Sequence, residues 1–122
     1  MRITPKGLDH VVINTPDIER SIAWYCDKLG LAPVRLEEWR RGEVFFPSVR
    51  VNAETIIDIF PANRTGQNVD HFCLVIEPAD LDALAAEFPG ARRADGLFGA
   101  QGEASSLYVQ DPDGNTVELR CY

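Results

Sequence analysis

The stretch Val69-Asp70-His71-Phe72-Cys73-Leu74-Val75-Ile76 decides the predicted fold of this chain. Its branched and aromatic residues are typical of a β-strand. The stretch Leu8-Asp9-His10-Val11-Val12-Ile13-Asn14 reads almost the same and holds the other of the two histidines in the sequence. Both strands carry an Asp-His pair, and a proline and a helical pattern follow each of them. The sequence therefore predicts two copies of one unit.

Each copy is predicted to contain a strand, a helix and three further strands. Module 1 spans about residues 7–61, with a strand at 8–14, a helix at 16–29 that Thr15 caps, and strands at 31–39, 43–51 and 55–60. Pro47 cannot donate a ladder hydrogen bond, so we expect a bulge or an unpaired edge there. Module 2 spans about 68–122, with strands at 69–76, 91–94, 105–110 and 116–121, a helix from Pro78 to 88 and a mobile glycine-rich loop at 96–102.

The composition limits the classes of protein to which the chain can belong. Its 122 residues suit one domain, here residues 1–122, with 45% hydrophobic and 25% charged residues. A net charge of −7 argues against a nucleic-acid partner, because phosphate binding needs clustered Lys and Arg. No apolar run reaches the ~18 residues of a membrane span. Three cysteines without a CxxC motif are expected to be reduced thiols in a cytoplasmic protein.

Two carboxylates lie at matching places in the two copies. Asp58 follows His10 by 48 residues, and Glu118 follows His71 by 47, each in an otherwise apolar strand. A buried carboxylate without a partner is costly, and a divalent cation removes that cost. Imidazole and carboxylate ligands suit Zn, Ni, Co, Mn or Fe. The set therefore predicts a metal site or an acid–base site.

A purely structural role is the alternative for each of these residues. A single strand histidine is commonly a structural residue that forms hydrogen bonds, and Asp58 could simply pair with Arg50. The agreement of two histidines and two carboxylates with one repeat favours a functional site.

A family resemblance rests on three groups of residues. They are the two Asp-His strands, the helix end Trp24-Tyr25-Cys26-Asp27-Lys28-Leu29-Gly30-Leu31, and Tyr108-Val109-Gln110-Asp111-Pro112-Asp113-Gly114-Asn115-Thr116-Val117-Glu118-Leu119. On these residues the chain, over about 7–121, resembles the vicinal oxygen chelate superfamily, which includes glyoxalase I, extradiol dioxygenases, methylmalonyl-CoA epimerase and bleomycin-binding proteins.

The resemblance implies an α+β fold in which two βαβββ modules form a curved, mixed-sheet cleft around one divalent metal ion. The ligand positions of the family fall on His10, Asp58, His71 and Glu118. Asp58 departs from the family pattern, which more often has Glu or Gln there. Its side chain is one methylene shorter, so Asp58 is expected to be a ligand, a residue behind the ligands, or the general base.

Three functions remain open at this stage. Four ligands imply a lyase or isomerase resembling glyoxalase I or an epimerase, which stabilises an enediolate of a small oxygenated substrate. Three ligands, without Asp58, imply an Fe(II) dioxygenase. A metal-free protein that sequesters a ligand, as in bleomycin resistance, is the third. The fosfomycin branch is disfavoured, because Val12 replaces its Thr and the loop at 96–102 has no Lys.

Further residues are expected to line the substrate site. Tyr108 is predicted to point into the cleft as a catalytic hydrogen-bond donor beside Asp58 and Glu118, with a packed core tyrosine as the alternative. A homodimer binding a small-molecule substrate is expected, with the site within one chain or shared by two. The predicted substrate-binding residues are Phe46, Ser48, Arg50, Cys73 and Tyr108.

Overall fold

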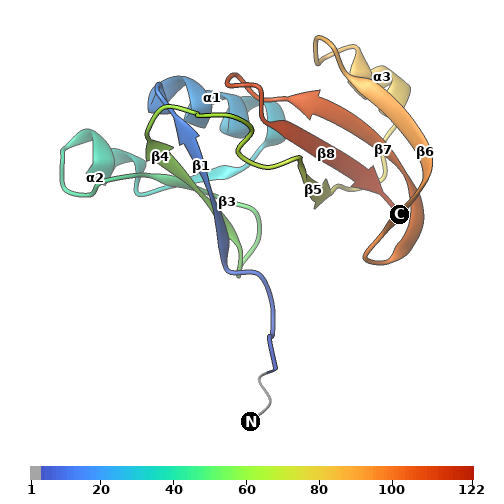
Figure 1. Ribbon diagram of the computed structural model, residues 1–122, viewed down its shortest axis with the longest axis horizontal. Helices are drawn as coiled ribbons and strands as arrows, with labels where there is room; N and C mark the ends of the chain where they lie inside the picture. Colours follow the sequence, from blue (N-terminus) through green and yellow to red (C-terminus); the bar gives the residue numbers. More distant parts are fainter. Residues whose placement is uncertain (1–3) are drawn as a thin grey trace. The chain divides into compact units, whose positions relative to one another are not determined.

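The computed structural model describes residues 4–122, which form two compact units (Figure 1). One unit extends to Thr65, and the other spans Gly66–Tyr122. In the first unit the elements are β1 (His10–Thr15), α1 (Ile18–Leu29), β2 (Ala32–Val34), α2 (Leu36–Arg40), β3 (Ser48–Arg50) and β4 (Ile56–Pro61). In the second they are β5 (Phe72–Val75), α3 (Leu81–Ala85), β6 (Arg92–Gly99), β7 (Gly102–Gln110) and β8 (Thr116–Cys121).

The two units have the same sheet topology. The strand order is β1-β4-β3-β2 in one sheet and β5-β8-β7-β6 in the other. In each sheet the first strand pairs in parallel with the last, and the remaining pairs are antiparallel. A parallel pair needs a crossover connection, which the helix and the two intervening strands supply. The predicted α+β fold of two βαβββ modules is confirmed, with α2 as an addition to the first.

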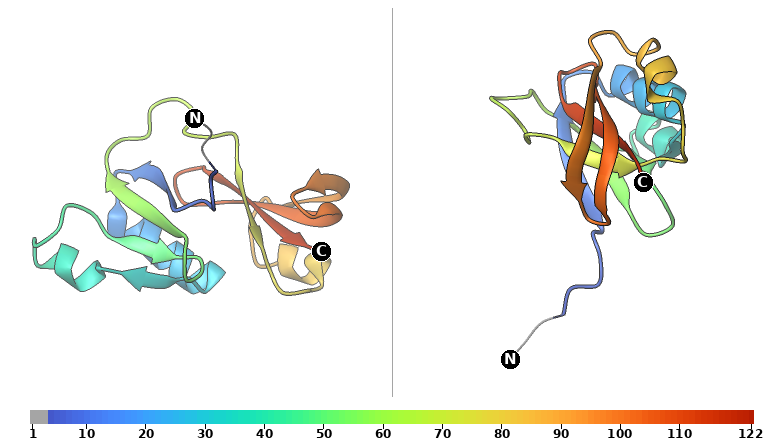
Figure 2. Two further views of the ribbon diagram at one scale, coloured as in Figure 1. Left: turned by 90° about the horizontal axis from the view of Figure 1, so that it is seen from below. Right: turned by 90° about the vertical axis from the view of Figure 1, so that its right-hand side faces the viewer.

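The core of the first unit lies between α1 and one face of its sheet, and Figure 2 shows α1 to one side of the strands of this unit. Ile22 and Tyr25 of α1 are buried, as are Ile57 and Ile59 of β4. Each such side chain contributes roughly 1.5–3 kcal/mol when fully buried. The spacing of two along β4 puts the intervening residue, Asp58, on the opposite face of the sheet.

The core of the second unit follows the same plan. Leu107 and Val109 of β7 and Val117 and Leu119 of β8 are buried, and α3 packs against β6 and β7. Glu118, between two core residues of β8, therefore lies on the sheet face away from them.

No helix among residues 4–122 is long and apolar enough to cross a membrane.

The first helix begins two residues later than predicted. Asp17 is its N-cap, because its carboxylate accepts a hydrogen bond from the Arg20 amide at 3.0 Å. The Thr15 hydroxyl instead accepts a hydrogen bond from the Asp17 amide. Gly30 ends the helix with a φ of 70°, as its sequence position predicts.

Two predicted strands of the first unit are wrong for most of their length. The strand expected at 31–39 ends at Val34, and α2 follows it; Arg40 pairs with Glu37 one turn earlier, which favours the helix. The strand expected at 43–51 is reduced to β3, which starts directly after Pro47. Proline has no N–H for the ladder, which explains that boundary.

The elements of the second unit differ from the prediction at several boundaries, and α3 ends at Ala85, earlier than the predicted residue 88. His71 directly precedes β5 and is not within it, and α3 begins at Leu81 with Asp80 as its cap. The glycine-rich segment 96–102, expected to be a mobile loop, forms the end of β6, a two-residue turn and the start of β7. A register shift between Ala94 and Leu97 absorbs the irregular sequence there.

Candidate functional site

In the first unit, His10 and Asp58 meet on the sheet face opposite α1. Asp58 pairs across the strands with Val12 on one side and Ser48 on the other, so His10 lies diagonally beside it. The His10 Nε2 is 3.8 Å from the Asp58 Oδ2. Asp58 is buried, whereas 48% of the His10 side chain is exposed.

The second oxygen of Asp58 is held by a short polar chain. The Ser48 hydroxyl donates to the Asp58 Oδ1 at 2.7 Å, and the Arg35 guanidinium donates to the Ser48 oxygen at 3.0 Å. These contacts fix the carboxylate so that its other oxygen faces His10. The alternative in which Asp58 simply pairs with Arg50 is not observed, because the Arg50 guanidinium donates to the carbonyls of Asn52 and Ala53.

Asp9 orients the His10 ring from the other side. The His10 Nδ1 is 2.7 Å from the Asp9 Oδ1. This hydrogen bond, with the nearby charge of Asp58, raises the pKa of His10 above its ordinary value of 6.5. When Nδ1 carries the proton for Asp9, Nε2 is left as the nitrogen that can bind a metal ion.

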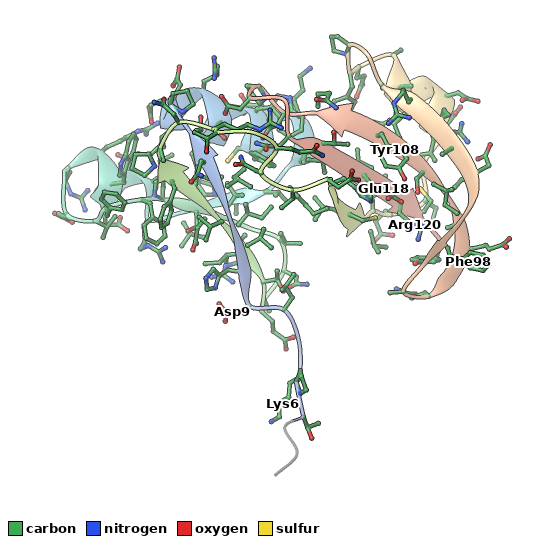
Figure 3. All side chains as sticks on the ribbon, viewed as in Figure 1. Lys6, Asp9, Phe98, Tyr108, Glu118 and Arg120 are labelled. Carbon is green, nitrogen blue, oxygen red and sulfur yellow. The ribbon has the colours of Figure 1, made fainter. Side chains whose placement is uncertain are left out.

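The second unit repeats this arrangement with a glutamate. The His71 Nε2 is 3.2 Å from the Glu118 Oε1, and the His71 Nδ1 is 2.6 Å from the Asp70 Oδ2. The Ser106 hydroxyl donates to the Glu118 Oε2 at 2.6 Å. The Arg120 Nε lies 3.3 Å from the same oxygen, and both side chains are almost fully buried. Figure 3 shows Glu118 and Arg120 on β8 beside Tyr108 on β7.

Glu118 remains a carboxylate in spite of its burial. Burial by itself would raise the pKa of Glu118. The interactions with the Ser106 and Tyr108 hydroxyls and the charge of Arg120 outweigh it, so the pKa lies below its ordinary value of 4.5. A negatively charged oxygen is the form that binds a cation or accepts a proton.

Tyr108 and Cys73 flank Glu118 on the neighbouring strands. Each pairs directly with Glu118 across the sheet, and the Tyr108 ring meets the His71 ring edge to face at 5.6 Å. Burial and the interaction with Glu118 raise the pKa of Tyr108, which keeps its hydroxyl a proton donor. Desolvation of the thiol and the Glu118 charge raise the pKa of Cys73 to about 11. Cys73 is therefore a neutral thiol near neutral pH.

Each histidine–carboxylate pair fits half of a metal site. A cation with bonds of about 2.1 Å places two adjacent ligand atoms about 3.0–3.4 Å apart. The 3.2 Å between His71 and Glu118 matches this spacing, and the 3.8 Å between His10 and Asp58 exceeds it, as the shorter side chain of Asp58 explains. No group of three or more possible ligands gathers among residues 4–122. The structure therefore provides donors in pairs, one pair in each unit.

Three polar residues that support the carboxylates, directly or through Ser48, were not predicted from the sequence. Ser106 and Arg120 contact Glu118, and Arg35 contacts Ser48. Arg120 and Ser106 share the strand parity of Glu118 and Tyr108, which could have identified them. Arg35 depends on a backbone turn that no sequence pattern indicates. Of the predicted substrate-binding residues, Arg50 lines a surface cavity of about 420 Å³ with Asp9 and Ile56.

Comparisons with known proteins agree with this description. The model of the Glyoxalase/Bleomycin resistance protein/Dioxygenase superfamily matches residues 7–119. The chain is 30% identical over 127 residues to the glyoxalase domain-containing protein RDO1 of Mycosarcoma maydis, covering 99% of this chain and 71% of that protein. It is 27% identical over 121 residues to virulence protein STM3117 of Salmonella typhimurium, covering 94% and 83%.

A solved structure shows the same fold. The lactoylglutathione lyase from Agrobacterium tumefaciens superimposes with a TM-score of 0.65 at 20% identity, over 97% of this chain and 95% of that one. The family match covers nearly all of the chain, both βαβββ units included. The chain therefore belongs to the Glyoxalase/Bleomycin resistance protein/Dioxygenase superfamily.

Proposed function

We propose that this protein is a divalent-metal-dependent enzyme, similar in chemistry to glyoxalase I or an epimerase, that acts on a small oxygenated substrate. The matched pairs His10–Asp58 and His71–Glu118 carry the proposal. In each pair a neighbouring Asp holds the imidazole, and a Ser holds the carboxylate. The same arrangement in both units favours a functional site over two unrelated structural histidines. The fold similarity to a lactoylglutathione lyase agrees with this class of reaction.

In the proposal, the two pairs supply the ligands of one cation, which is Ni, Co, Zn, Mn or Fe. When bound, this ion supplies Lewis-acid stabilisation of negative charge on two adjacent substrate oxygens. Glu118, held as a carboxylate by Ser106 and Arg120, accepts and returns the substrate proton. The neutral Tyr108 hydroxyl donates a hydrogen bond to a substrate oxygen.

A second candidate function rests on the geometry of Asp58. Its Oδ2 is 3.8 Å from the His10 Nε2, and its Oδ1 is engaged by Ser48. If Asp58 is not a ligand, the donor set becomes two histidines and Glu118, which suits an Fe(II) dioxygenase. Asp58 is then the proton acceptor for the substrate.

Two variants test the proposal and separate these candidates. Titration of Ni²⁺, Co²⁺ and, without oxygen, Fe²⁺ into the His71→Ala protein is expected to show at least a ~100-fold loss of affinity, because one ligand is removed. An unchanged affinity contradicts the metal site. A similar loss in Asp58→Asn identifies Asp58 as a ligand and supports the first candidate.

Turnover distinguishes an enzyme from a ligand-sequestering protein. The metal-loaded protein is assayed with the methylglyoxal–glutathione hemithioacetal, and by oxygen consumption with catechols. Isomerisation supports the first candidate. Oxygen consumption with metal affinity retained in Asp58→Asn supports the second. Tight metal binding without either reaction favours sequestration.

We also propose that the protein is a homodimer. In this proposal each metal site combines one His10–Asp58 pair with one His71–Glu118 pair. The two pairs come from the same chain or from two chains. Two-fold pairing is the commonest oligomeric arrangement on general grounds. The proposal includes a small-molecule substrate and neither a nucleic-acid nor a membrane partner.

A further inference from the structure

The two units differ beside their carboxylates. Equivalent residues of the two units are 60 positions apart in these strands, so Tyr108 corresponds to Ser48. By the same offset Ser106 corresponds to Phe46, and Arg120 corresponds to Phe60. The Arg120 guanidinium has its partners within the protein, because it donates to the Leu97 carbonyl at 2.7 Å and the Tyr122 hydroxyl at 3.3 Å. The first unit has aromatic rings at the equivalent place.

Three phenylalanines form this aromatic cluster. The Phe46 and Phe60 ring centroids are 4.7 Å apart at an interplanar angle of 42°. The Phe45 ring meets the Phe60 ring edge to face at 5.7 Å. Phe45 nevertheless remains 66% exposed, and Phe46 and Phe60 are partly exposed. A core cluster would bury these rings, so this one presents an aromatic surface near the end of β4 and the start of β3.

Arg35 brings a positive charge to the same surface. Its Cζ is 5.5 Å from the centroid of the Phe46 ring. Its one hydrogen bond to a side chain goes to the Ser48 hydroxyl, and among residues 4–122 no carboxylate forms an ion pair with it. The other guanidinium donors of Arg35 are therefore available to an anion. Through Ser48 this charge lies two hydrogen bonds from the Asp58 carboxylate.

The backbone of Arg35 is strained. Its φ of 58° and ψ of 26° make it the one non-glycine residue with positive φ among residues 4–122. It directly precedes α2 without a side-chain cap. A side chain in this conformation costs stability, and such strain is concentrated at binding sites. From this position the guanidinium lies over Phe46 and donates to the Ser48 hydroxyl.

We propose that Arg35 and the cluster Phe45, Phe46 and Phe60 form a binding subsite for a small aromatic carboxylate. The carboxylate takes the open edge of the Arg35 guanidinium, whose planar fork matches two oxygens. The flat ring packs against the phenylalanines, because aromatic rings gain from edge-to-face and offset contacts. The subsite gives the proposed function a class of substrate. It rests on the proposed function in one respect only, which is that the reacting oxygens of the substrate would face His10 and Asp58.

The test uses three probes of similar size on metal-free protein in EDTA. Benzoate has both features, cyclohexanecarboxylate lacks the aromatic ring, and benzyl alcohol lacks the charge. In amide NMR titrations benzoate is expected to shift the signals of Arg35, Phe46, Ser48 and Phe60. The other two probes are expected to bind at least 5-fold more weakly. Equal affinity for all three would overturn the proposal.

Matched variants assign the binding to Arg35. Arg35→Met keeps the length of the side chain and removes its charge, and a loss of benzoate affinity of at least 10-fold is expected. Arg41→Met removes an equivalent charge that is engaged by Glu43, and it should bind benzoate like the parent. Equal benzoate affinity in Arg35→Met and the parent would refute the subsite, as would an equal loss in Arg41→Met.

A second substitution covers the case in which Arg35→Met does not fold. Phe45→Ala removes the most exposed ring of the cluster, and a loss of at least 3-fold in benzoate affinity is expected; no loss would count against the subsite. Because EDTA removes metal ions, these results do not depend on the metal site. Failure of the proposed function would appear in the metal titrations instead.

Discussion

At the scale of the residue, the pKa of the Cys73 thiol depends on the charge of Glu118. Part of the Cys73 residue is exposed, but its thiol is desolvated and faces the carboxylate, and its pKa is raised to about 11. At pH 8 only about one molecule in a thousand carries the reactive thiolate. Removal of the Glu118 charge should lower this pKa, although desolvation should keep it above its ordinary value of 9.0.

Alkylation with iodoacetamide between pH 7 and 10.5 tests this prediction. The measurement uses protein in which Cys26 and Cys121 are replaced by Ser, so that only Cys73 reacts. We expect slow labelling that still rises at the top of the range, and faster labelling at every pH after Glu118→Gln. Equal labelling rates before and after Glu118→Gln, or a plateau near pH 9 in the parent, would contradict the described environment.

Single residues of the candidate site differ in how far the sequence could predict them. His10, Asp58, His71 and Glu118 were found because one repeat spacing relates them, and the structure brings them together as two pairs. Arg35 could not be predicted, since its role depends on a left-handed backbone conformation that arginine rarely adopts. The alternative pairing of Arg50 with Asp58 is absent because a nearby turn offers carbonyl acceptors to Arg50.

At the scale of the element, the Arg120 guanidinium occupies the space that a side chain at Gly99 in the β6–β7 hairpin would take. A Cβ there would overlap the Arg120 guanidinium, which bonds to the Leu97 carbonyl of the same hairpin. Gly99→Ala is therefore expected to displace Arg120 and to lower the free energy of unfolding by about 1–3 kcal/mol. Urea denaturation measures this change.

Gly7→Ala provides the matched control. A Cβ at Gly7 would have open space, so its effect on stability should stay within about 0.5 kcal/mol. If Gly99→Ala is as stable as Gly7→Ala, the contacts that Arg120 makes with the hairpin do not contribute to stability.

Elements with a strong periodic pattern were predicted well from the sequence. The α1 helix and the β4 and β8 strands lie close to their predicted positions, because apolar residues at spacings of 3.6 or 2 determine their buried faces. The region 31–51 was predicted poorly. Its charged residues form local ion pairs along α2, which favour a helix, and Pro47 sets the start of β3. Strand propensity therefore does not determine the structure of this region.

At the scale of the whole molecule, the internal repeat predicted two copies of one unit. The resemblance carried by three groups of residues implied the family and the α+β fold, and both are confirmed. The repeat works because two separate stretches must agree with one pattern. The number of chains in the active molecule could not be predicted this way, since the same repeat supports a site within one chain and a site shared by two.

Mixing experiments test a shared site in the proposed homodimer. His10→Ala and Glu118→Ala chains each lack one ligand. If each site takes its two pairs from different chains, a heterodimer of these variants contains one intact site. Mixing by unfolding and refolding is then expected to restore metal binding that neither variant shows alone. Absence of recovery, or a monomer by light scattering at micromolar concentration, would exclude the shared site.

The metal content of the purified protein tests the central proposal most directly. Inductively coupled plasma mass spectrometry after loading with Ni²⁺ or Co²⁺ and desalting is expected to find about one metal ion per chain in the parent. Glu118→Gln removes a ligand charge, whereas Glu103→Gln removes an exposed charge from β7. The account predicts loss of the metal in Glu118→Gln and full retention in Glu103→Gln. Equal metal content in the parent and both variants, or no metal in the parent, would contradict it.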